Sequence, residues 1–270
     1  MRIIFNIEYY TEFGQNIYIL GNIPELGSWD LSGAAPMDFI REGQWRADIL
    51  LNENAGQEIE YRYFLKDDRN QMVFNEWGEN RDLKLKEEGF FSVHIRDHWR
   101  VSVREENAYF MAAFTGNLWG RNVKKSRKIQ REHYNHRFQL YAPRIDADHH
   151  FCIIGNDEGL GQWNQERAIV MDDSEYPLWK IDLFLEGVEK PIQYKYGIFD
   201  IKEKRLVGWE EGENRLLDHD LTVIDNSLVI NTDLYYRHPQ GKWRGAGVAI
   251  PVFSLRTSRS FGVGEFPDLK

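Results

Sequence analysis

The sequence predicts an all-β protein with two antiparallel β-sandwiches in tandem, followed by the start of a third domain. Three observations lead to this prediction. A set of residues occurs twice in the same order, apolar residues alternate along both copies, and the character of the chain changes after residue 233. In neither copy do apolar residues recur every three or four positions over a long stretch, as they would in an amphipathic helix.

The repeated residues are the strongest of these signals. Gly21 and Trp29 recur as Gly155 and Trp163, each 134 residues further along the chain. The later landmarks keep the same order, which pairs Trp45 with Trp179, Tyr61 and Tyr63 with Tyr194 and Tyr196, Trp77 with Trp209, and Asn80 with Asn214. A domain of about a hundred residues, a normal size for a small sandwich, has therefore been duplicated.

Alternation of apolar and polar residues predicts the strands and the core. A run with period two begins at Trp45 and again at Trp179, which is typical of a strand with one buried face. We therefore place both indoles in the two cores. By the same alternation the four repeated tyrosines face inward, and Arg62 and Lys195 between them point outward.

These patterns divide the chain into four parts. We predict a first sandwich at 1–101, a linker at 102–133, a second sandwich at 134–233 and the incomplete start of another domain at 234–270. The linker contains a basic run at 121–131. This run could be a nucleic-acid-binding arm, but we interpret it as solvated linker because the 43 acidic residues of the chain outnumber its 34 basic ones.

Cysteine content and the N-terminal segment predict a cytoplasmic protein. The single cysteine, Cys152, cannot form an intrachain disulfide bond and suits a reducing compartment. Arg2 and Glu8 place charges too early for a secretory signal. No apolar run approaches the roughly 18 residues that a membrane span requires. We therefore expect no contact with a membrane.

Acidic and histidine residues do not form a convincing catalytic or metal site. The acidic pairs are Asp67–Asp68, Glu87–Glu88, Asp172–Asp173 and Glu210–Glu211, and we interpret them as solvated surface because adjacent side chains on a strand face opposite ways. The histidine pairs, His133 with His136 and His149 with His150, lack the cysteines or helical glutamate of zinc sites. We expect no catalytic residue, metal or cofactor in this chain.

Four tryptophans that fall outside the core pattern are candidates for ligand contact. Trp29, Trp77, Trp163 and Trp209 lie in loop-like stretches that contain glycine or acidic residues. One such indole could fold back over a core, but two in each copy favour exposed contacts. With a nearby cation and an asparagine amide they suit a sugar, whose C–H faces pack on indole while its hydroxyls need hydrogen-bond partners. The alternative is a scaffold in which these indoles bind a partner protein.

The combined motif resembles the starch-binding domains of carbohydrate-binding module family 20. It consists of Gly-Asn, Leu-Gly-x-Trp, an outward cation between tyrosines, and a Trp followed by Asn-Arg. The resemblance implies immunoglobulin-like sandwiches that bind α-1,4-glucans. The site residues it implies are Trp163, Lys195 and Trp209 with Glu210 and Asn214 at the rim in the second copy, and Trp29, Trp77, Asn80 and Arg62 in the first. Arg62 stands where the family has lysine, and Phe13 and Tyr176 are candidates for a second family site.

The tail resembles another family. Residues 247–255 and the glycine-rich stretch 261–265 are similar to the first barrel strand and loop of glycoside hydrolase family 77, the 4-α-glucanotransferases. The resemblance implies a (β/α)8 barrel that transfers glucosyl units with retention, using an Asp nucleophile and a Glu acid/base. Those carboxylates would come from later strands outside this sequence. We therefore expect a glucan-binding region that is inactive by itself.

Overall fold

The computed structural model describes residues 1–238 apart from 42, 53–57, 70, 85–89, 102–132, 143–147, 187–190 and 218–225. The predicted linker, except His133, and the predicted start of a barrel, except 234–238, lie outside these residues. The described residues form strands joined by turns and short 3-10 helices, which confirms the all-β prediction. Among them, no helix is long and apolar enough to cross a membrane.

We call residues 1–101 module 1 and residues 134–238 module 2. Module 1 contains β1 (Arg2–Glu8), β2 (Asn16–Gly21), η1 (Pro24–Trp29), η2 (Leu31–Gly33), β3 (Ala35–Pro36), β4 (Asp38–Arg41), β5 (Gln44–Leu50), β6 (Glu58–Lys66), β7 (Met72–Asn75), β8 (Arg81–Lys84) and β9 (Ser92–His98). Module 2 contains β10 (His136–Tyr141), β11 (His149–Gly155), η5 (Glu158–Leu160), η6 (Gln165–Arg167), β12 (Ile169–Val170), β13 (Asp172–Glu175), β14 (Leu178–Leu183), β15 (Ile192–Asp200), β16 (Arg205–Trp209), β17 (Arg215–Leu217) and β18 (Ser227–Asp233).

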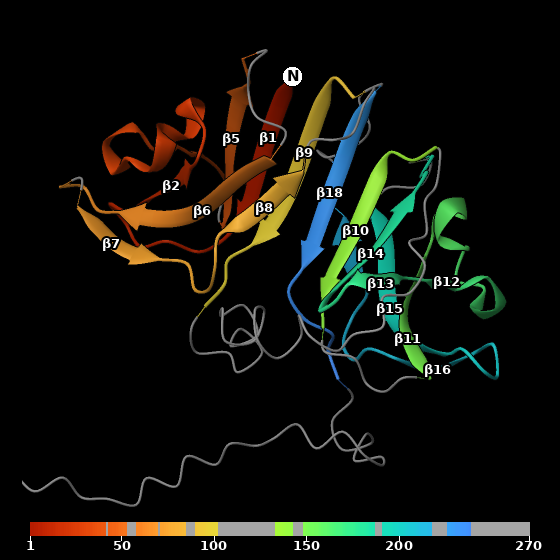
Figure 1. The fold of residues 1–270 in the computed structure, drawn as a ribbon. Helices are drawn as coiled ribbons and strands as arrows, with labels where there is room; N and C mark the ends of the chain where they lie inside the picture. The colour runs from red at the N-terminus through yellow and green to blue at the C-terminus, as the bar shows by residue number, and fades with distance from the viewer. Residues whose placement is uncertain are drawn as a thin grey trace, which may run out of the picture.

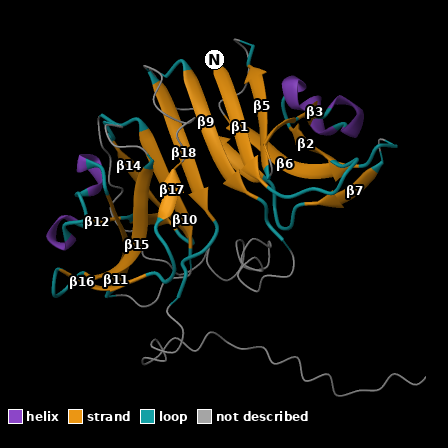
Figure 2. Ribbon diagram, turned by 180° about the vertical axis from the view of Figure 1, so that it is seen from behind, coloured by secondary structure: helices purple, strands orange, loops and turns teal. Residues whose placement is uncertain are grey.

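The two modules share one sheet (Figures 1 and 2). This shared sheet has eight strands in the order β13-β14-β10-β18-β9-β1-β5-β4. Each module adds a smaller outer sheet: β3-β2-β6-β7 with β8 beside β6 in module 1, and β12-β11-β15-β16 with β17 beside β15 in module 2. The modules meet where their last strands, β9 and β18, pair in parallel from Ser92 opposite Ser227 to Arg96 opposite Asn231. The sequence suggested two separate sandwiches, whereas their backbones join in one ladder.

Strand β18 contributes to both cores. All seven of its residues are buried. Leu228 and Ile230 pack in the core of module 1, whereas Val229 packs in the core of module 2. Since successive side chains of a strand point to opposite faces, the two outer sheets must cover opposite faces of the shared sheet.

The core tryptophans are where the sequence placed them. Trp45 in β5 and Trp179 in β14 are buried in the cores of module 1 and module 2. Each indole N–H donates to a backbone carbonyl, from Trp45 to Tyr9 at 3.2 Å and from Trp179 to Ala142 at 3.0 Å. Burial of these rings therefore leaves no unsatisfied donor.

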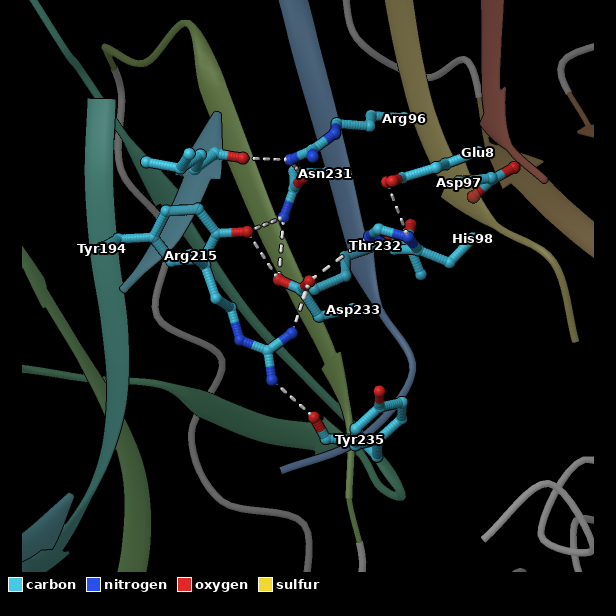
Figure 3. Close-up of polar contacts among 12 residues, drawn as sticks. Glu8, Arg96, Asp97, His98, Tyr194, Arg215, Asn231, Thr232, Asp233 and Tyr235 are labelled. Atoms are coloured by element: carbon cyan, nitrogen blue, oxygen red, sulfur yellow. Dashed lines mark hydrogen bonds and ion pairs between the residues drawn. The ribbon is translucent and has the colours of Figure 1, made fainter. Parts of the chain in front are cut away.

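Both cores contain the same buried polar network. In module 2 the hydroxyls of Tyr194 and Tyr196 donate to Asp233 at 2.9 and 2.8 Å. Arg215 forms an ion pair with Asp233 at 2.8 Å (Figure 3). It forms a second ion pair with Glu210 at 2.7 Å. The corresponding residues of module 1 are Tyr61, Tyr63, Asp97, Arg81 and Glu76. The inward orientation predicted for the four tyrosines is confirmed.

Three residues of the acidic pairs are not the solvated surface that the sequence suggested, whereas Glu211 is exposed as expected. Asp172 and Asp173 are both buried, and so is Glu210. Glu210 is compensated by hydrogen bonds from Arg215 at 2.7 Å and from Arg237 at 3.0 Å. Burial by itself would raise the pKa of Glu210, but these guanidinium groups hold the pKa below its ordinary value.

Polar contacts reinforce the seam between the modules (Figure 3). Arg96 of β9 donates to the side chain of Asn231 at 3.1 Å and to the carbonyl of Leu216 at 2.6 Å. His98 lies 3.7 Å from Asp233 of module 2 and 3.8 Å from Glu8 of module 1. The seam thus combines a backbone ladder, shared apolar packing and side-chain contacts.

Protonation of His136 is expected to destabilise module 2 at mildly acidic pH. His136 is buried at the start of β10, and burial lowers the pKa of its imidazole from 6.5 to about 4. The unfolded chain therefore takes up this proton at a higher pH than the folded chain does. Consequently the free energy of unfolding should fall by roughly 3 kcal/mol as the pH drops from about 6.5 to 4.

Urea denaturation at several pH values measures this slope. The His136→Gln variant should lose most of the slope, whereas the control His133→Gln changes an exposed histidine and should keep it. An equal slope in wild type and His136→Gln would contradict the assignment.

Candidate functional site

An asparagine in each module ties the turn after the first outer strand to the neighbouring strand. In module 1 the side-chain oxygen of Asn22 accepts from the N–H of Glu60 at 3.0 Å, and its amide donates to the carbonyl of Glu58 at 3.2 Å. In module 2 Asn156 repeats both bonds, with Gln193 at 2.8 Å and Pro191 at 3.1 Å. The Gly-Asn motif therefore has a structural role beside the tryptophan loop.

The glycine of this motif allows that loop to lie close to the sheet. A Cβ at Gly155 would lie 2.3 Å from the carbonyl oxygen of Gln193 and 2.8 Å from the side chain of Leu160. Leu160 is fully buried beneath the loop. Trp163 follows with φ near 60°, and its N–H donates to the carbonyl of Gly155 at 2.8 Å. The backbone is fixed in this way while 38% of the Trp163 surface stays exposed.

Trp29 has a similar backbone conformation in module 1. Its φ is 66°, Leu26 is fully buried beneath it, and 39% of its surface is exposed. A Cβ at Gly21 would lie 2.6 Å from the carbonyl oxygen of Glu60. Both modules thus present a half-exposed indole on a constrained backbone.

The outward cations fasten the next loop. Lys195 lies between the buried Tyr194 and Tyr196 on β15, and its Nζ donates to the carbonyl of Gly212 at 2.7 Å. In module 1 Arg62 donates to the carbonyl of Gly78 at 3.0 Å. Each cation therefore keeps a partly exposed charge beside the tryptophan surface and also orients the loop.

In module 2 the second indole lies on the same face as Lys195. Trp209 ends β16 directly opposite Gly197, and a Cβ at Gly197 would lie 3.0 Å from a ring atom of Trp209. Lys195 and Gly197 are two residues apart on β15 and so share its outward face. Trp163 is bonded to β11, the neighbour of β15, next to the pair Gly155–Tyr194. The structure therefore brings Trp163, Lys195 and Trp209 onto one outer surface.

Module 1 has no indole at the position of Trp209. The N–H of Tyr63 donates to Glu76 at 3.1 Å, as that of Tyr196 donates to Glu210 at 3.1 Å, so the two glutamates are equivalent. The residue before Glu76 is Asn75, which makes Asn75 the counterpart of Trp209.

The pairing of Trp77 with Trp209 from the sequence was therefore wrong. Trp77 corresponds to Glu211, and the offset between the copies stays at 134 throughout this loop. The strand opposite Asn75 carries the buried Phe64, where module 2 has Gly197 to accommodate a ring. Trp77 is 39% exposed, but it lies two residues further along the chain than Asn75, the counterpart of Trp209.

The predicted rim residues take different positions. Asn214 is exposed and donates to the side chain of Gln193 at 3.1 Å, and Asn80 donates to Glu60 at 3.3 Å. Glu210 is buried under Arg215 and presents no surface at the rim. Gln193 was missed by the sequence analysis, although its place two residues before Lys195 puts it on the same outward face.

The two candidates for a second site differ in exposure. Phe13 is completely exposed in the turn before β2. Tyr176, in the turn between β13 and β14, is partly buried against the core of module 2. The structure thus leaves Phe13 as the more accessible ring.

The described residues contain no cluster of three or more His, Cys, Asp or Glu side chains that could hold a metal ion. Of the predicted histidine pairs, His136 is buried beside Asn135, with 2.7 Å between its Nδ1 and the asparagine oxygen. His149 lies 3.8 Å from Asp200. The outer surfaces described above carry indole rings, amides, cations and, at Glu60, a carboxylate.

Comparison with known proteins agrees with this chemistry. Residues 1–93 and 134–223 match the family profile described as the starch binding domain, and the chain belongs to this family. The resemblance stated from the sequence motifs is confirmed.

Particular relatives extend the similarity. Over its whole length the chain is 30% identical to "4-alpha-glucanotransferase DPE2" of Oryza sativa subsp. japonica, in an alignment of 285 residues that covers 29% of that protein. It is 36% identical over 103 residues to "Glucoamylase P" of Amorphotheca resinae, which covers 37% of this chain and 16% of that protein. The solved glucoamylase of Hormoconis resinae matches 38% of this chain and 18% of its own, with 33% identity and a TM-score of 0.33. The chain thus spans less than a third of the rice protein.

Proposed function

We propose that the chain is the α-glucan-binding region of a 4-α-glucanotransferase. The observation that carries this proposal is the grouping of Trp163, Lys195 and Trp209 on one outer surface of module 2. Family membership and the similarity to the rice protein along the whole chain support it. The ligands are starch, glycogen or maltodextrin.

The chemistry of this surface suits a glucan. Two indoles that together cover ~100–200 Å² of apolar sugar surface would contribute roughly 2.5–5 kcal/mol. Asn214, Gln193 and Lys195 supply hydrogen-bond partners for hydroxyl groups around the rings. Ordering of the ligand opposes binding, so one module should bind with a Kd of about 0.1–1 mM.

Catalysis belongs to a part of the protein outside the described residues. The buried carboxylates described here, such as Glu76, Glu210 and Asp233, are held by arginines inside the cores and do not reach the outer surface. We assign retaining transfer of glucosyl units between α-1,4-glucans, with a pair of carboxylates, to that other part. We place the protein in the cytoplasm on the basis of its single buried cysteine, Cys152.

Affinity electrophoresis in a gel that contains glycogen tests the binding surface. Combined Trp163→Ala and Trp209→Ala substitutions should lower the apparent affinity for glycogen, read from the retardation, at least about twofold, since both apolar platforms of module 2 are lost and only module 1 can still bind. Ile201→Ala is the control, because it removes an exposed apolar side chain from the turn after β15, away from the indoles.

Unchanged retardation of the double variant, with a native circular dichroism spectrum, would show that the surface is wrongly assigned. Absence of retardation in the wild type would instead favour the alternative, a scaffold whose exposed indoles bind a partner protein.

A further inference from the structure

We infer that module 1 has its own glucan-binding surface at Trp29 and Arg62, and that this surface points away from that of module 2 across the shared sheet, so that the chain holds two separate glucan chains at once. A short linear chain then occupies one surface at a time, and a ligand with many chains can be cross-linked. This inference rests on the proposed function, and it goes further because it concerns how the two modules act together.

The orientation of the surfaces follows from the shared sheet. The tyrosines of β6 point inward to Asp97 on β9, and the tyrosines of β15 point inward to Asp233 on β18. His98 lies on the same face as Asp233 and contacts it, so its neighbour Asp97 lies on the opposite face. The outer sheets therefore approach the shared sheet from opposite sides.

The ligand surfaces lie on the far sides of these outer sheets. Arg62 and Lys195 project from β6 and β15 away from the tyrosines, and hence away from the shared sheet. Packed sheets lie about 10 Å apart, so two such layers separate the surfaces by at least about 20 Å along the sheet normal. They are also displaced sideways, because the outer sheets cover different halves of the shared sheet (Figures 1 and 2). A short linear glucan bound at one surface therefore does not reach the other surface.

The seam fixes this arrangement. Turning one module against the other would break the parallel ladder between β9 and β18 and withdraw Leu228 and Ile230 from the core of module 1. It would also break the bonds from Arg96 to Asn231 and Leu216. The modules therefore do not behave as two binding sites on a flexible tether, which could swing to the same side.

This geometry predicts which ligands gain from having two modules. A second contact is strengthened by a high effective concentration only if the ligand can reach both sites. For a linear glucan that already fills one site, a moderate increase in length should raise the affinity only slightly, because the added glucose units do not reach the second site. A particle of glycogen presents many chains, and two particles can be held on the two sides of one protein molecule.

The test compares wild type with two variants, Trp29→Ala in module 1 and the combined Trp163→Ala and Trp209→Ala in module 2. The probes are maltoheptaose, a linear maltooligosaccharide of twice that length, and glycogen. Calorimetry gives the number of oligosaccharides bound per chain, and dynamic light scattering measures cross-linking of glycogen particles.

Wild type should bind two molecules of either oligosaccharide, and doubling the length should change the affinity by less than about threefold. It should cross-link glycogen, and each variant should bind one oligosaccharide and lose the cross-linking. A stoichiometry of one in wild type, or an affinity about tenfold or more higher for the longer chain, would overturn the inference and leave the proposed function intact. Absence of binding to all three probes would overturn the proposed function itself.

Discussion

Replacing Arg215 by methionine will lower the free energy of unfolding by about 3–5 kcal/mol, as expected when one partner of a buried ion-pair network is removed. Arg215 is the group between Glu210 and Asp233, both of which are buried. Burial alone would raise the pKa of Asp233, but Arg215 holds this pKa far below its ordinary value. Without the guanidinium group, each carboxylate must stay charged in an apolar environment or take up a proton.

Urea denaturation followed by tryptophan fluorescence measures this loss. The matched control is Arg205→Met, which breaks an exposed pair with Glu203 and should change stability by no more than about 0.5 kcal/mol. The variant should also regain part of its lost stability at lower pH relative to wild type, because protonation relieves its uncompensated carboxylates. A loss no larger than that of the control would refute the network as a source of stability.

The second large effect concerns a residue that stabilises a module other than its own. Leu228→Ala should lower the free energy of unfolding by about 2–5 kcal/mol, because the side chain is fully buried and a cavity remains. The cavity opens in the core of module 1, although Leu228 belongs to the last strand of module 2. Hydrogen exchange should therefore accelerate at the amides of β1, next to β9 in the shared sheet.

Leu50→Ala is the control for this variant. Leu50 lies in β5 of the same sheet but is 74% exposed, so its loss should be small. If Leu228→Ala speeds exchange only in module 2, and β1 keeps its protection, the shared core does not act as one unit.

Period-two alternation was sufficient to predict the cores. It placed Trp45, Trp179 and the paired tyrosines inside, because side chains that alternate along a strand sort by polarity between its two faces. It also placed Arg62 and Lys195 outside for the same reason.

Alternation could not reveal the seam, which depends on pairing between strands far apart in the sequence. A signal was nevertheless present in β18, where Leu228, Val229 and Ile230 form an unbroken apolar run. Such a run is typical of a strand that is covered on both faces. Which residues cover the second face depends on the tertiary structure and cannot be deduced from a local sequence pattern.

The binding surface was predictable in module 2 and misread in module 1. In module 1 the presence of a tryptophan at a similar place in the sequence led to the pairing of Trp77 with Trp209. The backbone instead follows the spacing of five residues that separates Glu76 from Arg81 and Glu210 from Arg215. A buried ion pair constrains the loop more tightly than an exposed ring does, because an unpaired charge inside the core costs more than a displaced surface side chain.

The position of β18 also determines when module 1 can finish folding during synthesis. Domains usually fold in turn as they leave the ribosome, the N-terminal one first. Module 1 emerges early, but its core lacks Leu228 and Ile230 until nearly all of module 2 has been translated. Until then the edge of β9 stays unpaired, and such an edge can join strands of other chains. Module 1 is therefore synthesised before module 2, but its core is completed only after nearly all of module 2 has been synthesised.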